Sequence, residues 1–234
     1  MEHIGYIMDG NRRYAEKQKI SIKEAYYKAI KTFFEIVEIH LKEKIPHATF
    51  YALSTQNYMN REKIELKETL GFIKEFFYNK DIEETLLTNK IKVIIHGNFE
   101  KLSKEKSFAT KIFKKELLGK FKKFETIEKP NLTVHVALNY GGREEILEAV
   151  KKILKDKPKK LTEKEFKKYL QFAEVPDPEI IVRTGKCQRL SNFLTWHSTY
   201  SELYFSPKLW PEFGKADLIE ALTWFKQQKR NFGK

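Results

Sequence analysis

The strongest constraint on the fold of this chain is a regular alternation of short apolar runs with longer segments of helical periodicity. Six runs have the length of a β-strand: 3–8, 48–53, 91–96, 132–138, 179–183 and 202–205. Segments whose apolar residues recur every three or four positions lie mostly between them: 21–44, 62–77, 103–124, 142–155, 162–171 and 215–230. Strands that alternate with helices favour a parallel sheet covered on both faces. We therefore predict an α/β fold with a mainly parallel central sheet of about six strands.

The size and composition of the chain fit one globular domain, which we expect to span 1–234. Of its 234 residues, 41% are hydrophobic, enough to bury a sizeable core. No apolar run approaches the length that crosses a bilayer, and the first ten residues lack the pattern of a signal peptide. The single cysteine, Cys187, excludes an intrachain disulfide. We expect a cytoplasmic protein.

The net charge of +13 raises the alternative of a basic nucleic-acid-binding protein. Such a protein needs a clustered basic patch with aromatic side chains on the same face, on which bases can stack. Here 38 lysines are scattered among 27 glutamates, and the aromatic residues lie mostly in apolar stripes. This distribution is typical of a solvated surface with many salt bridges, so we expect no nucleic-acid partner.

Polar and glycine-rich loops follow the first five strand-length runs. They read DGNRR, STQNYMNR, GN, NYGGR and TGKCQRLSN, and four of them contain one or two of the seven arginines. The carboxyl ends of parallel strands lie at one edge of a sheet, where open α/β sheets bind their ligands. Helices that begin there offer free N–H groups to an anion, and arginine suits phosphate oxygens. The pattern predicts a phosphate site, with Asp9 as the one aspartate beside an arginine pair.

Five sequence blocks identify a family. They are MDGNRRYA (8–15), YALSTQNY (51–58) with Arg61 and Glu65, LNYGGR (138–143), RTG with RLSNF (183–193), and WHSTYSELYFSPKLWPEF (196–213). In this order and spacing they resemble the cis-prenyltransferases, the undecaprenyl diphosphate synthase family. The resemblance runs from His3 to Gly233, and the DDxxD clusters of the unrelated trans-prenyltransferases are absent.

The resemblance implies an activity and partners. Members of the family add isopentenyl diphosphate to an allylic diphosphate, usually farnesyl diphosphate, with Mg²⁺. The product is a long-chain cis-polyprenyl diphosphate such as undecaprenyl diphosphate, a glycan lipid carrier. The resemblance further implies a homodimer and a peripheral contact with the inner face of the membrane for product release.

The resemblance also assigns roles to residues. Asp9 would hold Mg²⁺ and act in catalysis with Asn57, and Glu202 would complete the metal site. The residues placed at the substrates are Gly10, Asn11, Arg12, Arg13, Ser54, Tyr58, Arg61, Arg183, Arg189, Ser191, Arg230 and Gly233. Of these, Gly10, Asn11 and Arg13 would cradle the allylic diphosphate. Arg183, Arg189 and Ser191 would bind the diphosphate of isopentenyl diphosphate. Arg230 and Gly233 would reach the isopentenyl diphosphate that is bound to the neighbouring protomer.

Two departures from the family pattern bear on function. Ile22, Ala25 and Tyr26 stand where the family has an arginine and a Gly-His pair that bind the allylic diphosphate. Residues 186–188, Lys-Cys-Gln, replace Gly-Glu-His after the RTG block. These two departures leave open a second alternative to an active enzyme: a weakly active or inactive subunit of the same fold that stabilises an active partner.

Overall fold

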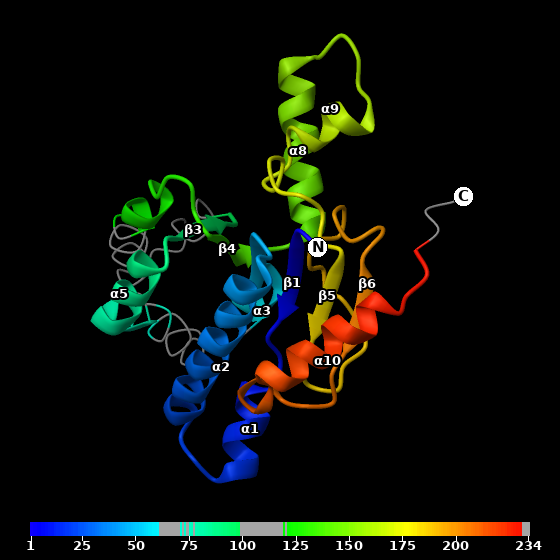
Figure 1. The fold of residues 1–234 in the computed structure, drawn as a ribbon. Coiled ribbons are helices and arrows are strands. Elements are labelled where there is room, and N and C mark those ends of the chain that lie inside the picture. The colour runs from blue at the N-terminus through cyan, green and yellow to red at the C-terminus, as the bar shows by residue number, and fades with distance from the viewer. Residues whose placement is uncertain are drawn as a thin grey trace.

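A computed structural model describes residues 1–60, 71, 73, 75–76, 78–98, 119 and 121–230. Within these residues six strands form one sheet: β1 (His3–Ile7), β2 (His47–Ser54), β3 (Ile91–His96), β4 (Leu132–Tyr140), β5 (Ile180–Arg183) and β6 (Glu202–Phe205) (Figure 1). Their order is β3-β4-β2-β1-β5-β6, and every pairing is parallel. The predicted α/β fold is confirmed, and each predicted strand is present.

The described helices are α1 (Asn11–Gln18), α2 (Ile22–Glu43), α3 (Thr55–Asn60), α5 (Lys80–Thr88), α8 (Gly142–Asp156), α9 (Glu163–Lys167) and α10 (Lys215–Lys226). A short 3₁₀ helix, η1, covers Trp210–Glu212. Helices α9 and α10 are shorter than the predicted segments, and α5 was not predicted. The predicted helices 62–77 and 103–124 fall largely outside the described residues.

Helix α2 begins where its sequence dictates. The Ser21 hydroxyl accepts a hydrogen bond from the Glu24 amide at 3.2 Å, and the Glu24 carboxylate accepts one from the Ser21 amide at 2.8 Å. This reciprocal pair satisfies two amides that a helix start leaves without a partner. The predicted apolar stripe is buried, with Phe33 and Ile36 facing the sheet core.

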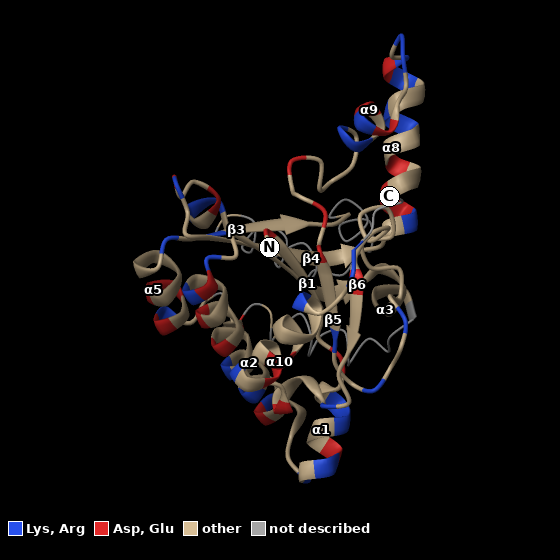
Figure 2. Cartoon of the chain, turned by 45° about the vertical axis from the view of Figure 1, so that its right-hand side comes forward, with Lys and Arg blue, Asp and Glu red and all other residues tan. Residues whose placement is uncertain are grey.

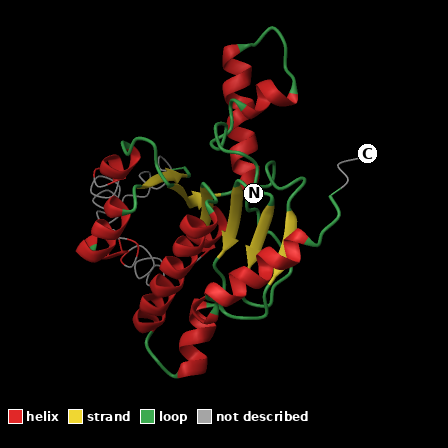
Figure 3. Ribbon diagram, in the orientation of Figure 1, coloured by secondary structure: helices red, strands yellow, loops and turns green. Residues whose placement is uncertain are grey.

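The larger core lies on the face of the sheet that α2 and α10 cover. Tyr6 of β1 stacks on Phe50 of β2 at 4.8 Å between ring centroids, and Phe33 of α2 packs on the same ring. The indole nitrogen of Trp210 donates to the carbonyl oxygen of Ala29 at 3.2 Å, which fastens η1 to α2. Helix α8, by contrast, extends away from the sheet (Figure 3). The packing of α2 against the sheet therefore fixes the position of this helix beside the carboxyl ends of β1 and β2.

A row of histidines lies on the opposite face of the sheet. His96 Nδ1 donates to the carbonyl of Gln171 at 3.1 Å, so its Nε2 accepts from His135 Nδ1 at 2.9 Å. His135 Nε2 in turn accepts from His47 Nδ1 at 3.1 Å. His96 and His135 thus each use one nitrogen as donor and the other as acceptor, so both rings are neutral, and burial lowers the pKa of His96 to about 4.

Of the helices in the described part of the chain, none combines the length and the apolar character that a bilayer crossing needs.

Candidate active site

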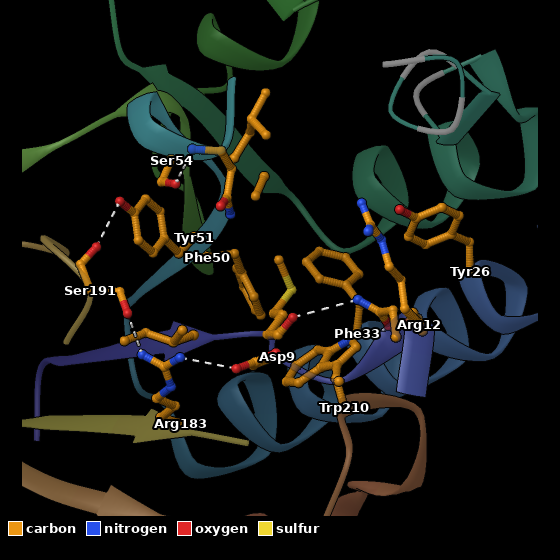
Figure 4. A pocket seen from close by; sticks show the side chains of 18 of the residues that line it. Asp9, Arg12, Tyr26, Phe33, Phe50, Tyr51, Ser54, Arg183, Ser191 and Trp210 are labelled. Atoms are coloured by element: carbon orange, nitrogen blue, oxygen red, sulfur yellow. Dashed lines mark hydrogen bonds and ion pairs between the residues drawn. The ribbon is translucent and has the colours of Figure 1, made fainter. Parts of the chain in front are cut away.

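A pocket of about 930 Å³ opens at the carboxyl ends of β1, β2 and β5, with α2 along one side (Figure 4). Its lining divides into two parts of different character. The polar part holds Asp9, Gly10, Asn11, Arg12, Arg13, Glu16, Ser54, Gln56, Asn57, Arg183, Arg189 and Ser191. The apolar part includes Ala29, Ile30, Phe33, Phe50, Ala52, Leu53, Ile73, Phe76, Val136 and Trp210. Of the five predicted loops, those after β1, β2 and β5 converge there, whereas residues 97–98 after β3 and 139–143 after β4 do not line the pocket.

Asp9 is held through its backbone by two distant segments. The hydroxyl of Thr184, which follows β5, accepts from the Asp9 amide at 3.0 Å and donates to its carbonyl oxygen at 2.8 Å. The amide of Trp210 donates to the same carbonyl at 3.0 Å. These contacts fix the direction of the carboxylate without occupying it.

Two arginines bind the Asp9 carboxylate, one on each oxygen. Arg13 Nη2 donates to Oδ1 at 3.0 Å, and Arg183 Nη2 donates to Oδ2 at 2.9 Å. The Asp9 side chain is 31% exposed, whereas that of Arg183 is 4% exposed. The Asp9 carboxylate is thus accessible from the pocket and at the same time neutralises the positive charge of the buried Arg183 guanidinium.

Arg183 also ties Asp9 to the loop after β5. Its Nη1 donates to the Ser191 hydroxyl at 2.7 Å and to the carbonyl oxygen of Arg189. Its Nε is buried, and none of the described residues gives it a hydrogen-bond partner. Asp9, Arg183 and Ser191 therefore form one continuous polar contact across the pocket floor, as Figure 4 shows.

Two glycines allow this close packing. Gly10 begins α1 with a φ of 115°, and a Cβ there would meet the Leu209 side chain at 2.8 Å. Gly185 has a φ of 87°, and a Cβ there would lie 2.6 Å from Arg13 Nη2. Because Gly185 has no side chain, Arg13 Nη1 can reach its carbonyl at 2.6 Å. The glycines thus bring the start of α1 against Asp9.

The loop after β2 supplies the opposite side of the polar part. Ser54 ends β2, and its hydroxyl accepts from the Asn57 amide at 3.0 Å, which starts α3. Ser54, Gln56 and Asn57 all line the pocket.

Figure 4 places Arg12 and Tyr26 at the far side of the pocket from Arg183, where the two side chains lie beside each other.

The electrostatics of the polar part suit a phosphate-bearing ligand. Four arginines line it against two carboxylates, Asp9 and Glu16, among the described residues. The start of α1 adds free backbone N–H groups beside Gly10. Because an apolar chamber adjoins this cationic part, the pocket suits a molecule with an anionic head and a hydrocarbon tail.

The residues at Asp9 fit a magnesium ion that a phosphate helps to hold. Among the described residues no group of three or more histidine, cysteine, aspartate or glutamate side chains is arranged to hold a metal alone. Mg²⁺ is commonly bound through one or two carboxylates together with substrate phosphates. Asp9 offers one such carboxylate, and Asn11, which also lines the pocket, has a buried Oδ1 for which the described residues provide no hydrogen-bond partner.

Within one chain, Glu202 does not join Asp9 as the sequence led us to expect. Glu202 pairs in register with Ile180, which pairs with Ile4, whereas Asp9 follows Ile7 at the other end of β1. The levels of Ile4 and Ile7 alone are three residues apart, about 10 Å along the strand. An Asp9–Glu202 metal site therefore does not form inside one protomer.

Other expected residues also lie elsewhere. Arg230 is at the Glu202 end of the sheet, where its guanidinium lies 3.8 Å from the carboxylates of Glu179 and Glu202. Tyr58 is buried in the main core and does not line the pocket. Arg61 and Gly233 fall outside the described residues.

Among the contributors to the site that the sequence analysis did not name, three come from its own sequence blocks. Thr184 and Trp210 hold the Asp9 backbone, and Gln56 lines the polar part. Each lies inside one of the five sequence blocks, which was the available signal. Trp210 is buried in the core and also lines the pocket.

Comparisons with known proteins agree with this geometry. The family model described as "Putative undecaprenyl diphosphate synthase" matches residues 7–233. An isoprenyl transferase of Aquifex aeolicus is 35% identical over 233 residues, covering 100% of this chain and 96% of that protein. A tritrans,polycis-undecaprenyl-diphosphate synthase (geranylgeranyl-diphosphate specific) of Methanopyrus kandleri is 37% identical, with 100% and 84% covered.

A solved structure shows the same fold. The lavandulyl diphosphate synthase of Lavandula x intermedia, in complex with dimethylallyl diphosphate, superposes with a TM-score of 0.87. It is 28% identical, and the match covers 100% of this chain and 98% of that one. The chain therefore belongs to the undecaprenyl diphosphate synthase family, the cis-prenyltransferases.

Proposed function

We propose that this cis-prenyltransferase condenses isopentenyl diphosphate with farnesyl diphosphate and repeats the step to make a long-chain polyprenyl diphosphate such as undecaprenyl diphosphate. The observation that carries the proposal is the continuity of the arginine-rich part of the pocket with a large apolar chamber. A diphosphate requires the first and a growing hydrocarbon requires the second. Such a product would serve as a lipid carrier for glycans.

The polar part offers groups for two diphosphates. In the proposal, Gly10, Asn11 and Arg13 at the start of α1 bind the allylic diphosphate. Arg183, Arg189 and Ser191 bind that of isopentenyl diphosphate. Asp9 lies between the two sets through its contacts with Arg13 and Arg183. When bound at Asp9, Mg²⁺ would neutralise charge on the diphosphate oxygens.

In the reaction the allylic C1–O bond breaks, C1 bonds to C4 of isopentenyl diphosphate, and a proton leaves C2 as inorganic diphosphate is released. Negative charge grows on the leaving diphosphate, where preorganised arginine donors stabilise it. Positive charge develops on the allylic carbons. The aromatic rings of Phe33, Phe50 and Trp210 line the adjoining wall, where aromatic side chains suit such a cation and exclude water. Asn57 faces the pocket from the other side, in position to orient the reacting groups.

The choice of allylic substrate can be tested directly. Relatives such as the Methanopyrus kandleri protein are named geranylgeranyl-diphosphate specific, so geranylgeranyl diphosphate is the competing candidate. Purified protein, labelled isopentenyl diphosphate and Mg²⁺ are incubated with equal amounts of both allylic diphosphates, and the extracted products are resolved by chain length. We expect products of the farnesyl series to dominate. Dominance of the geranylgeranyl series would overturn this part of the proposal.

A homodimer is the proposed assembly, and an exposed apolar stripe supports it. On α8, Leu147 is 60% and Leu154 69% exposed, with Val150 between them on the same side. The edge strand β6 adds the exposed Leu203. A second copy of the chain is the occupant we propose, because an edge strand and a protruding helix present self-complementary surfaces to a two-fold partner. Sedimentation of Leu147→Lys, expected to be monomeric, tests this.

The two alternatives have less support. An inactive subunit need not keep Asp9, Asn57 and Arg183 around one pocket, as this chain does. For a nucleic-acid-binding protein, Figure 2 shows Lys and Arg dispersed over the helices with Asp and Glu between them. A peripheral contact with the inner membrane face remains part of the proposal, because the product is a lipid that must leave the chamber.

A further inference from the structure

The loop that carries Ser191 adopts a backbone conformation that needs support. Ser191 has a φ of 52°, Asn192 of 65° and Leu194 of 47°. Residues with a side chain seldom adopt such left-handed values, and they persist where the surroundings hold them in place. The loop matters because the Ser191 hydroxyl and the Arg189 carbonyl receive the Nη1 of Arg183. A shift of the loop would therefore turn this guanidinium.

Asn192 holds one side of the loop by binding the start of α8. Its Oδ1 accepts from the Arg143 amide at 2.9 Å, and its backbone carbonyl accepts from the Gly142 amide at 2.8 Å. Its Nδ2 donates to a Glu144 carboxylate oxygen at 3.0 Å. The residue before the helix is Gly141, which provides no side-chain cap. Asn192 thus replaces the missing cap from a segment about 50 residues away.

The close approach of the two segments is built into the sequence. A Cβ on Gly141 would lie 2.6 Å from the side-chain Nδ2 of Asn192, and one on Gly142 would clash with the Thr195 hydroxyl. Gly141 thus leaves room for the Asn192 side chain, and Gly142 leaves room for Thr195 at the end of the same loop. The α8 start and the loop therefore form one rigid unit.

Tyr51 holds the other side of the same loop. Its hydroxyl lies 3.3 Å from the Ser191 carbonyl and 3.1 Å from that of Tyr140, and its ring stacks on Phe193 at 4.7 Å. Tyr51 lines the pocket, whereas Asn192 does not. Asn192 can thus influence the site only through the loop.

We propose that Asn192 is a positioning residue of the transfer reaction: by joining the Ser191 loop to α8, it fixes Ser191 and Arg183 to receive a diphosphate. This rests on the proposed function, in which these two residues bind isopentenyl diphosphate. The competing interpretation is that Asn192 only stabilises α8. The two interpretations differ in what a folded variant does with a diphosphate.

The test compares Asn192→Ala with Thr162→Ala. Thr162 caps α9, the next helix, by accepting from the Glu165 amide at 3.3 Å, and it has no part in the Ser191 loop. Both variants lose a helix cap. Binding of inorganic pyrophosphate is measured by titration calorimetry at a temperature where both are folded. We expect Asn192→Ala to weaken binding on the order of 10- to 100-fold, as small displacements of binding groups do, and Thr162→Ala to leave it unchanged.

Further variants separate the effect of the left-handed backbone at residue 192 from the effect of its side-chain hydrogen bonds to α8. Asn192→Gly relieves the left-handed φ but removes the side chain, so it should bind as weakly as Asn192→Ala. Asn192→Asp places a carboxylate against Glu144, and the double variant Asn192→Asp, Glu144→Gln restores a donor and an acceptor with their roles exchanged. We expect the double variant to recover most of the affinity lost in Asn192→Asp.

In steady-state kinetics the defect of Asn192→Ala should be a raised KM for isopentenyl diphosphate, with the KM for the allylic substrate unchanged. Normal pyrophosphate binding by folded Asn192→Ala or Asn192→Gly would overturn the proposal and leave Asn192 a helix cap. Wild-type protein that binds pyrophosphate but transfers no prenyl group would instead contradict the proposed function, while the pyrophosphate comparison would still decide the role of Asn192.

Discussion

Oδ2 of Asp9 accepts a hydrogen bond from Nη2 of Arg183 at 2.9 Å, which joins the ends of β1 and β5 across the pocket. The contact gives Asp9 two opposite effects on an anion. Its negative charge competes with a diphosphate for Arg183, yet the same carboxylate is the group available to a metal ion that the diphosphate brings.

Asp9→Asn should separate these effects. We expect turnover to fall by about 10² or more, because a charged group that stabilises the reacting diphosphate through the metal is lost. Without metal, inorganic pyrophosphate should bind the variant at least as tightly as wild type, because the competing carboxylate is gone. Calorimetry in EDTA measures this. Weaker metal-free binding would show that Asp9 does not compete for the arginines.

Tyr26→His should strengthen binding of the allylic diphosphate. Tyr26 lines the pocket next to Arg12, at a position where the family pattern has a histidine. A charge-assisted hydrogen bond to phosphate is worth about 1.5–3 kcal/mol, so one added contact should lower the KM for farnesyl diphosphate at least several-fold. Tyr26→Phe serves as the control and should not lower it. An unchanged KM in Tyr26→His would show that the diphosphate does not reach this side of the pocket.

Acid should unfold the protein through its buried histidines. Burial lowers the pKa of His3 to about 3 and of His40 and His96 to about 4, from the usual 6.5. The unfolded chain therefore binds more protons below pH 6.5, and the stability that these neutral rings confer is complete above pH 6.5 and lost as pH falls toward 4. Each ring contributes a slope of up to about 1.4 kcal/mol per pH unit.

His197 contributes to the pH dependence of stability with the opposite sign. Its burial would lower its pKa, but Asp177 and Glu145 outweigh that effect and raise it. Its contribution is complete below pH 6.5 and lost as pH rises through the folded value. Urea unfolding between pH 7.5 and 4.5 measures the balance. His96→Gln should flatten the dependence of the unfolding free energy on pH over this range. A slope identical to that of wild type would contradict the assignment of a neutral buried ring.

Arg230→Ala tests the expectation that the tail serves the neighbouring protomer. In its own chain Arg230 donates to the Tyr200 carbonyl at 2.9 Å, at the end of the sheet remote from Asp9. If the tail crosses a dimer interface, the variant should raise the KM for isopentenyl diphosphate without changing the sedimentation of the dimer. Lys229→Ala is the matched control. Normal kinetics in Arg230→Ala would show that its contacts are structural.

Much of the fold could be predicted because β4 and its neighbours are continuous apolar runs. The predicted strand boundaries lie within two residues of those observed, and the largest difference is the extension of β4 by Asn139 and Tyr140. Helix α5 was missed because its capping residue, Asn79, follows directly on another apolar segment without a visible break. Periodicity alone does not divide two adjacent amphipathic helices.

The site was predictable as a set of loops but not as a set of contacts. The motifs placed Asp9, Arg13 and Arg183 together, and the structure joins them. Within one chain Glu202 lies at the other end of the sheet from Asp9, so its expected place at the metal stays a prediction that needs a second copy of the chain. The histidine row escaped notice because His47, His96 and His135 lie on three different strands and meet only through sheet order.

The most direct test of the central claim is the formation of an extended prenyl product at this pocket. Labelled isopentenyl diphosphate, farnesyl diphosphate and Mg²⁺ are incubated with wild type, Asp9→Asn and Arg143→Gln, and the extracted lipids are resolved by chain length. Arg143 is an exposed arginine at the start of α8 that does not line the pocket. We predict extended products with wild type and Arg143→Gln and almost none with Asp9→Asn. No extended product with wild type, or equal product from Asp9→Asn, would contradict the account.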